Sequence, residues 1–133
     1  MAEEIKVKIG TAISSGPRKL MEARGRDAVL GLPKTVSIDS EEVSEAISST
    51  LSAITACVKN VLEQTPPELA SDIIDRGIVM TGGASQLRSL DRLIANQTGV
   101  SAYVSEDPMQ CVVYGCGMAL ENIEAWRRAV VRG

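Results

Sequence analysis

The feature that most constrains the fold is a short apolar run followed at once by a pair of glycines. Residues 78–80 are all apolar, and Gly82 and Gly83 come directly after Thr81. Such a run is typical of a strand that is covered on both faces. Apolar residues then recur at helical spacing from Leu87 onward and predict a helix that closes at residues 96–99. The order of strand, glycine loop and helix indicates an α/β fold.

The glycine loop at residues 81–85 allows two interpretations. Glycines let a ligand approach the backbone closely, and the free amides at a helix start attract negative or polar groups. Alternatively, the turn needs glycine only because its backbone has a positive φ. The loop has neither the Gly-Lys-Ser or Gly-Lys-Thr of a Walker motif nor the G-x-G-x-x-G pattern. By itself, the loop therefore leaves both interpretations open.

The residues after this helix repeat the alternation of strand and helix. Residues 101–104 predict a second short strand, and residues 109 to about 128 predict a final helix. This alternation favours parallel strands with helices on the faces of the sheet. Gly115 and Gly117 each cost roughly 1 kcal/mol inside a helix, which predicts a closely packed partner. Trp126 is interpreted as a packing anchor near the end of the chain.

The strongest helix prediction covers residues 40 to about 64. Apolar residues recur there every three or four positions, and Asp39 or Ser40 can cap the first amides. A Pro-Pro pair at residues 66–67 stops this helix. A short second helix then begins with proline in its first turn and ends at Gly77.

The first forty residues give weaker signals. Short runs at residues 19–23 and 35–38 predict a β-hairpin with a long connection, because turn residues gather between them at 31–33. The apolar residues of 3–13 recur at alternate positions, as in a strand, and at intervals of four, as in a helix. Periodicity alone does not decide between strand and helix for this segment.

The chain lacks the residues that several classes of enzyme need. It has no histidine, which excludes Ser-His and Cys-His nucleophilic pairs within the chain. The cysteines Cys57, Cys111 and Cys116 do not have the spacing of a metal site. We interpret them as buried, reduced thiols.

Charge and hydropathy argue against nucleic-acid binding and against a membrane-spanning segment. The chain has 14 Lys and Arg against 17 Asp and Glu, a formal net charge of -3, which is the wrong sign for binding nucleic acid. Its three aromatic residues offer no platform for stacking bases. No apolar run approaches the roughly 20 residues needed to cross a bilayer, so no membrane segment is predicted and a cytoplasmic location is expected.

Six runs follow one another in a specific order. They are AEEIK at 2–6, MEARGRD at 21–27, GLPK at 31–34, TPPELASDI at 65–73, RGIVMTGG at 76–83 and EDP at 106–108. Together they closely resemble the MreB family of bacterial actin-like, cell-shape-determining proteins. The match spans nearly the whole chain in the same order.

The resemblance implies a partial actin-like (ribonuclease H-like) ATPase fold, in which two lobes close around ATP. Residues 1–39 would be part of the small subdomain of the second lobe, with a helix and the β-hairpin. Residues 40–133 would be the large subdomain of that lobe, with an adenosine loop at 81–85. The resemblance also implies that the start of the chain is helical.

The resemblance further implies a partial, weak site for ATP, or another adenine nucleotide, on two segments. Its residues would be Glu3, Glu4, Ile5, Lys6, Gly82, Gly83, Ala84 and Ser85. The family often has a basic residue where Glu4 stands and a third glycine where Ala84 stands, so the charge near the ribose and the purine wall both differ. The phosphate loops and the magnesium site of the family come from a first lobe, in segments that would precede Met1. Positioning and electrostatics supply most of the catalysis of phosphoryl transfer, so this chain alone is not expected to be an enzyme.

By this resemblance, the chain is part of a filament-forming, ATP-binding cytoskeletal protein that directs cell shape. The expected partners are other copies of the chain or full-length filaments of the family. Two alternatives stay open: the second-lobe part of another phosphotransferase of the actin superfamily, or a regulator that caps filaments.

Overall fold

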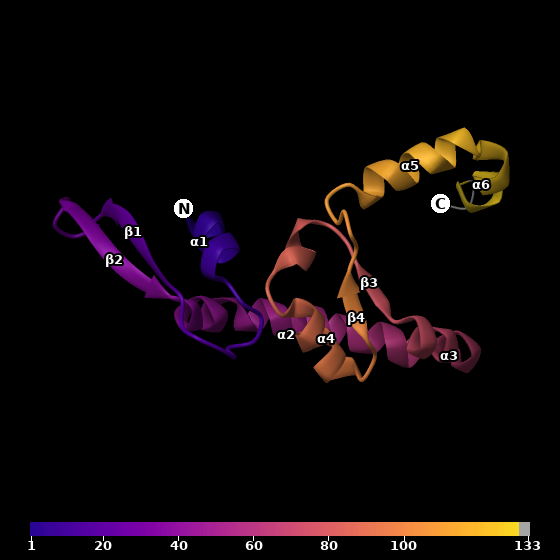
Figure 1. The fold of residues 1–133 in the computed structure, drawn as a ribbon, viewed down its shortest axis with the longest axis horizontal. Coiled ribbons are helices and arrows are strands. Elements are labelled where there is room, and N and C mark those ends of the chain that lie inside the picture. The colour runs from indigo at the N-terminus through magenta and orange to yellow at the C-terminus, as the bar shows by residue number, and fades with distance from the viewer. Residues whose placement is uncertain (131–133) are drawn as a thin grey trace.

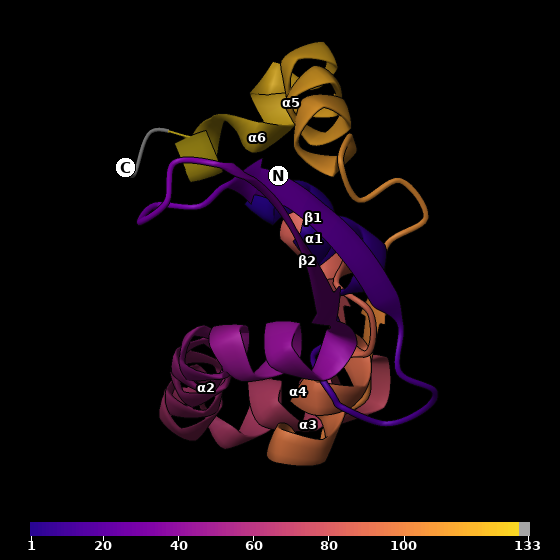
Figure 2. The same ribbon diagram turned by 90° about the vertical axis from the view of Figure 1, so that its left-hand side faces the viewer.

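The computed structural model describes residues 1–130, so the last three residues of the predicted large subdomain lie outside it. The described elements, in chain order, are α1 (Ala2–Ile9), β1 (Leu20–Arg26), β2 (Pro33–Asp39), α2 (Ser40–Gln64), α3 (Pro67–Arg76), β3 (Ile78–Met80), the 3₁₀ helix η1 (Gly83–Gln86), α4 (Leu90–Thr98), β4 (Ala102–Val104), α5 (Cys111–Glu121) and α6 (Ile123–Val130). The β1–β2 hairpin lies at one end of the molecule and α5 with α6 at another (Figure 1). A view from the side shows the hairpin arching above the layer of α2, α3 and α4 (Figure 2).

The strands pair as the sequence predicts. β1 and β2 form an antiparallel hairpin whose register runs from Leu20 opposite Asp39 to Arg26 opposite Pro33. β3 and β4 are parallel, with Val79 opposite Tyr103. The α/β fold class, the hairpin and the parallel pairing are therefore confirmed.

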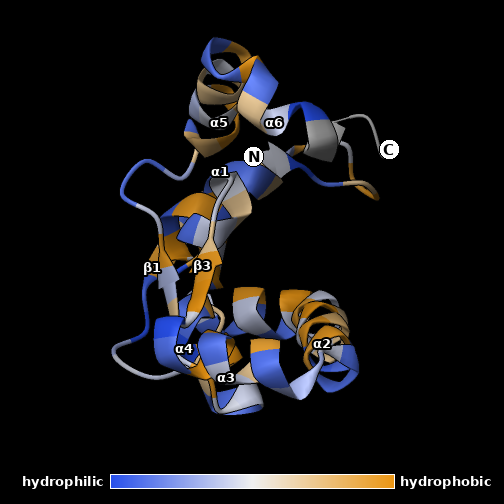
Figure 3. Ribbon diagram, turned by 90° about the vertical axis from the view of Figure 1, so that its right-hand side faces the viewer, coloured by the Kyte–Doolittle hydropathy of each residue, from blue (hydrophilic) through white to orange (hydrophobic). Residues whose placement is uncertain are grey.

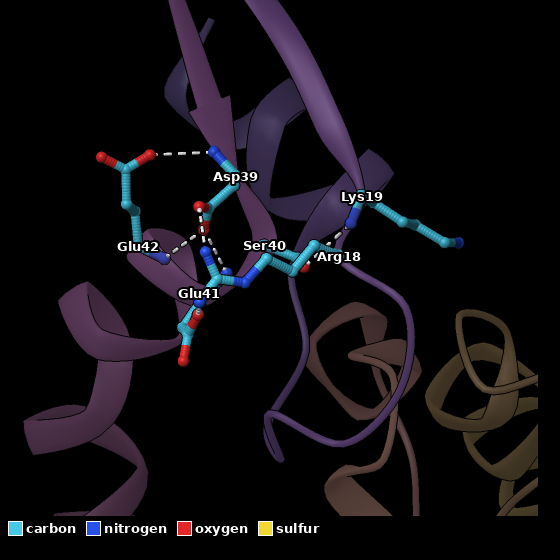
Figure 4. Close-up of polar contacts among 6 residues, drawn as sticks. All are labelled: Arg18, Lys19, Asp39, Ser40, Glu41 and Glu42. Carbon is cyan, nitrogen blue, oxygen red and sulfur yellow. Dashed lines mark hydrogen bonds and ion pairs between the residues drawn. The ribbon is translucent and has the colours of Figure 1, made fainter.

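The long helix α2 begins with a complete capping box (Figure 4). The carboxylate of Asp39 accepts from the backbone N–H of Glu41 at 2.7 Å and of Glu42 at 2.9 Å. The Glu42 carboxylate in turn accepts from the Asp39 N–H at 2.8 Å. These bonds satisfy amides that no helical carbonyl can reach, and the negative side chains suit the positive end of the helix dipole. Asp39 is thus the cap, and Ser40 is the first helical residue.

The cap makes the stability of the protein depend on pH. Hydrogen bonds from the N–H of Glu42 and then of Glu41, with the nearby Arg18 guanidinium, lower the pKa of Asp39 below its ordinary value. A carboxyl with a lowered pKa stabilises the fold fully above the unfolded-state pKa of about 3.9. This contribution is lost as the pH falls through the pKa of the folded state.

We expect Asp39→Ala to lower the melting temperature at pH 7 by about 3–5 °C, because two amides lose their acceptor. The difference from the parent protein should shrink when thermal unfolding is followed by circular dichroism at pH 2.5. Asp72→Ala, at an exposed position within α3, serves as the control. An equal loss from both substitutions, or a difference that is the same at both pH values, would contradict this role of Asp39.

The core lies between one face of the β3–β4 pair and the helices α2 and α4. Its buried members are Ala12, Leu51, Met80, Leu90 and Ile94, and half-buried apolar residues of the same elements pack around them. β3 is apolar along its length, as is much of α2 (Figure 3). The segment after α1 joins this core through Ala12, whose N–H donates to the Arg88 carbonyl at 2.8 Å. The core therefore links the start of the chain to residues near its middle.

The other face of the β3–β4 pair is open, so the prediction of a strand covered on both faces is wrong. Val79 is 52% exposed and Tyr103 is 48% exposed, while Met80 on the core side is 8% exposed. An apolar sequence is compatible with burial of both faces of a strand, but it does not determine whether another element of the chain covers the second face.

Two helix boundaries differ from the prediction. The glycine loop leads first into η1, and α4 begins only at Leu90, so Leu87 lies between the two helices. The predicted last helix is divided into α5 and α6 at Asn122, whose φ of -121° and ψ of 41° are not helical. In both places, local turns interrupt a pattern that the spacing of apolar residues alone would continue.

Predictions of close packing near the end of the chain are also wrong for the described residues. A Cβ placed on Gly115 or Gly117 would meet no atom within 4 Å. Trp126 is 51% exposed, so it is not a packing anchor. The three cysteines are free thiols, in agreement with the prediction, but they are not buried, because Cys57 and Cys116 are exposed and Cys111 is half-buried.

No helix of residues 1–130 is both long enough and apolar enough to cross a membrane. The predicted division of the chain after residue 39 stays a prediction. At that point β2 passes directly into α2 without a linker.

Candidate functional site

The first wall of the candidate site is α1, whose sequence fits a helix or a strand equally well. The structure confirms the helix that the resemblance implies. Oppositely charged residues one turn apart form ion pairs: Glu3 with Lys6 at 2.8 Å, and Glu4 with Lys8 at 2.7 Å. Acidic residues in the first turn and basic residues in the last also suit the helix dipole. These interactions favour the helical periodicity over the alternating one.

The second wall is the glycine loop, which internal hydrogen bonds hold in shape. Gly82 has a φ of 82° and a ψ of 168°, a conformation that favours glycine. Its N–H donates to the Pro108 carbonyl at 2.6 Å. The hydroxyl of Ser85, which is 5% exposed, donates to the Gly82 carbonyl at 2.6 Å. Gly82 is therefore needed for the backbone conformation, and Ser85 acts inside the loop.

The two walls meet at a cavity of about 420 Å³. Four of the predicted site residues line it: Glu3 and Lys6 from α1, and Gly83 and Ala84 from the glycine loop. Residues that are about eighty positions apart in the sequence thus face one space. A Cβ on Gly83 would lie 3.0 Å from the Met109 sulfur, so a side chain there would require a small shift of Met109.

The other four predicted residues do not line the cavity. Glu4 bonds to the Lys8 ammonium instead, and this hydrogen bond lowers the pKa of the Glu4 carboxyl. Ile5 is half-buried, Gly82 shapes the turn, and the Ser85 hydroxyl bonds within the loop. The structure therefore brings together half of the predicted set.

The cavity also has lining residues that sequence reasoning did not select. Gln86, Leu87 and Arg88 extend the glycine loop, Lys19 precedes the hairpin, and an apolar floor comes from α2 and α4 with Ile47, Leu51, Ile54 and Leu90. The sequence could have indicated Leu87 as a lining residue, because it follows the glycine pair by one helical turn. No sequence pattern could have indicated Lys19 and the α2 residues, since only the tertiary fold brings them to the cavity.

The cavity has chemistry that suits an adenosine group better than a metal. Its apolar floor can cover a flat ring, and the Glu3 carboxylate and Gln86 amide can bond to hydroxyl and amino groups. Within the described part of the chain, no three His, Cys, Asp or Glu side chains are placed to hold a metal ion. The lining is therefore suited to a mostly apolar ligand that also carries hydrogen-bonding groups.

Comparison with known proteins adds the family. The chain matches the MreB/Mbl protein family over residues 1–128. It is 44% identical over 131 residues to the cell shape-determining protein Mbl of Bacillus cereus, covering 98% of this chain and 39% of that protein. It is 46% identical over 123 residues to the cell shape-determining protein MreB of Escherichia coli, covering 92% of this chain and 35% of that protein.

Solved structures agree with the sequence relatives. The fold superposes on MreB5 of Spiroplasma citri bound to ADP with a TM-score of 0.85 at 33% identity, covering 98% of this chain and 39% of that one. The same protein bound to AMPPNP gives a TM-score of 0.84. The chain spans 35–39% of the length of these relatives and corresponds to part of the actin-like MreB fold. With the family match over nearly its whole length, the chain belongs to the MreB/Mbl family.

Proposed function

We propose that this chain carries the adenosine side of the ATP pocket of an actin-like, filament-forming protein that directs cell shape. The observation that carries the proposal is the shared cavity, in which Glu3 and Lys6 of α1 face Gly83 and Ala84 of the glycine loop. The Glu3 carboxylate accepts hydrogen bonds from the ribose hydroxyls, and the glycine loop packs against the purine. Support comes from the ADP and AMPPNP complexes of the similar Spiroplasma citri protein.

The proposed role stops short of catalysis. Among the described residues no acidic cluster is placed to hold magnesium. Hydrolysis of ATP requires residues that bind the phosphates and the metal ion, and a residue that positions the attacking water molecule. The chain by itself therefore binds nucleotide weakly and does not turn it over. Its partners are further copies of the chain or longer filaments of the family.

An amide NMR titration with ATP and magnesium tests the proposal. We expect shifts confined to residues 3–6 and 81–88, with a dissociation constant of about 1 mM or weaker, because only nucleoside contacts contribute. Glu3→Ala should reduce the initial slope of the titration about fivefold, the effect of losing one hydrogen bond of roughly 1 kcal/mol.

The control is Glu45→Ala, which removes an exposed carboxylate of α2. Glu45 does not line the cavity, so this variant should titrate like the parent protein. Association state is checked on each sample by light scattering. Equal responses of the two variants, or micromolar binding with one nucleotide per chain, would contradict the proposed site.

A further inference from the structure

Gln86, the last residue of η1, brings a polar side chain to the wall of the cavity that the glycine loop forms. Three of the four residues of η1 line this cavity, namely Gly83, Ala84 and Gln86. The fourth, Ser85, is buried, and its hydroxyl donates to the Gly82 carbonyl inside the loop. Gly83 and Ala84 offer only backbone and a methyl group. Gln86 is therefore the residue through which η1 can form side-chain hydrogen bonds with a ligand.

The Gln86 amide has a fixed backbone but no bonding partner of its own. The Leu87 N–H donates to the Ala84 carbonyl at 3.1 Å, which closes the turn that contains Gln86. The Gln86 side chain is exposed and forms no hydrogen bond within residues 1–130. By contrast, the amides of Gln64 and Gln97 each bond to a side chain of α2. Both the oxygen and the nitrogen of the Gln86 amide are thus available to a ligand.

The other polar side chains of the cavity differ from Gln86 in what they can bond. The Glu3 carboxylate only accepts hydrogen bonds, the Lys6 ammonium only donates them, and these two groups form an ion pair at 2.8 Å. The Thr50 hydroxyl does both, but through a single atom. An amide donates and accepts through two neighbouring atoms. Among the described residues that line the cavity, Gln86 alone matches a donor and an acceptor that lie side by side.

One edge of adenine carries such a pair of groups. The amino group on C6 donates and the nearby N7 accepts, and a glutamine amide can bond to both at once. In a 6-oxo purine the same edge has two acceptors, O6 and N7, so the amide can make only one of these bonds. On the N1 side, an amide can rotate to suit either base. Only the N7 edge therefore lets one glutamine distinguish the two classes of purine.

We propose that Gln86 makes this site selective for adenine over 6-oxo purines, by donating to N7 and accepting from the 6-amino group. This inference rests on the proposed function, because it requires the nucleoside to occupy the cavity. The apolar floor from α2 and α4 covers the ring, and the held backbone of η1 sets which edge of the ring meets the amide.

Amide NMR titrations with ATP, inosine triphosphate and 7-deaza-ATP test the proposal. Inosine triphosphate replaces the 6-amino group with an oxygen, and 7-deaza-ATP replaces N7 with a carbon. The initial slope at residues 81–88 should be about fivefold lower for 7-deaza-ATP than for ATP, the effect of one lost hydrogen bond. It should be about tenfold lower for inosine triphosphate, because the amide oxygen then faces a second acceptor.

Two substitutions of Gln86 separate the two bonds. Gln86→Leu removes both, so it should lower the slope for ATP about tenfold and give equal slopes for the three nucleotides. Gln86→Glu keeps the shape of the side chain but cannot donate to N7. This variant should therefore bind ATP and 7-deaza-ATP with equal slopes.

The matched control is Gln64→Leu, which makes the same change at the exposed end of α2, outside the cavity. It should keep the preference of the parent protein for ATP, and circular dichroism confirms that each variant is folded. If ATP moved no resonances in residues 3–6 and 81–88, the proposed function would fail and this inference with it. Equal slopes for ATP and inosine triphosphate in the parent protein, or a preference for ATP retained by Gln86→Leu, would overturn the role of Gln86 alone.

Discussion

Replacing Ile94 with alanine is expected to lower the free energy of unfolding by about 3 kcal/mol. Ile94 is 4% exposed and belongs to the cluster that joins α2, α4 and β3. Removing its outer carbons leaves a cavity whose walls come from several elements, so no single shift fills it. Denaturant unfolding should show the loss directly, and the melting temperature should fall by about 10 °C.

Ile74→Ala provides the matched control, because it makes the same change on an exposed helical surface. Ile74 is 65% exposed in α3, and its truncation should alter stability by no more than about 0.5 kcal/mol. If the two variants lost equal stability, the core would not lie where the structure places it.

Replacing Gly77 with alanine should destabilise the protein by about 3 kcal/mol, for a different reason. Gly77 has a φ of 78° and a ψ of -177°, which an L-residue rarely adopts. An added Cβ would also lie 2.8 Å from the Ser101 carbonyl oxygen. That oxygen accepts from the Ile78 N–H at 2.7 Å, so the clash acts on the first bond between β3 and β4. Hydrogen exchange at Ile78 should accelerate along with the loss of stability.

Gly82→Ala separates the two causes. Gly82 has nearly the same backbone conformation as Gly77, with a φ of 82° and a ψ of 168°, but a Cβ there would meet no atom within 4 Å. Its cost should be about 2 kcal/mol, the penalty of the backbone conformation alone. Equal costs at both glycines would show that the contact with Ser101 contributes nothing.

The parts of the fold that the sequence predicts well depend on neighbouring residues. The start of α2 was predictable because Asp39 and Glu42 are three residues apart and bond to each other's amides. The end of α3 was predictable because Gly77 is the residue type that a positive φ favours. In each case the determining contacts lie within a few positions of the residue.

The predictions that were wrong concern features that depend on contacts between segments far apart in the sequence. Nothing near Val79 tells whether a second layer covers β3, and nothing near Gly115 tells whether α5 has a neighbour. The residues that line the cavity show the same difference between what the sequence indicates and what only the tertiary fold determines. Glu3 and Gly83 were predicted from a family resemblance, whereas Lys19 is placed there only by the path of the chain after α1.

The direct passage from β2 into α2 has a mechanical consequence. α2 has 25 residues and is therefore about 37 Å long. The angle between it and the hairpin depends on the backbone of Asp39, which its bonds to Glu41 and Glu42 hold at a φ of -105° and a ψ of 164°. The bond from the Ser40 N–H to the Lys19 carbonyl, 2.9 Å long, braces the same junction. These bonds hold the hairpin and the helix at one angle, so a displacement of residues 27–32, which connect β1 to β2, would also displace α2 and its core residue Leu51.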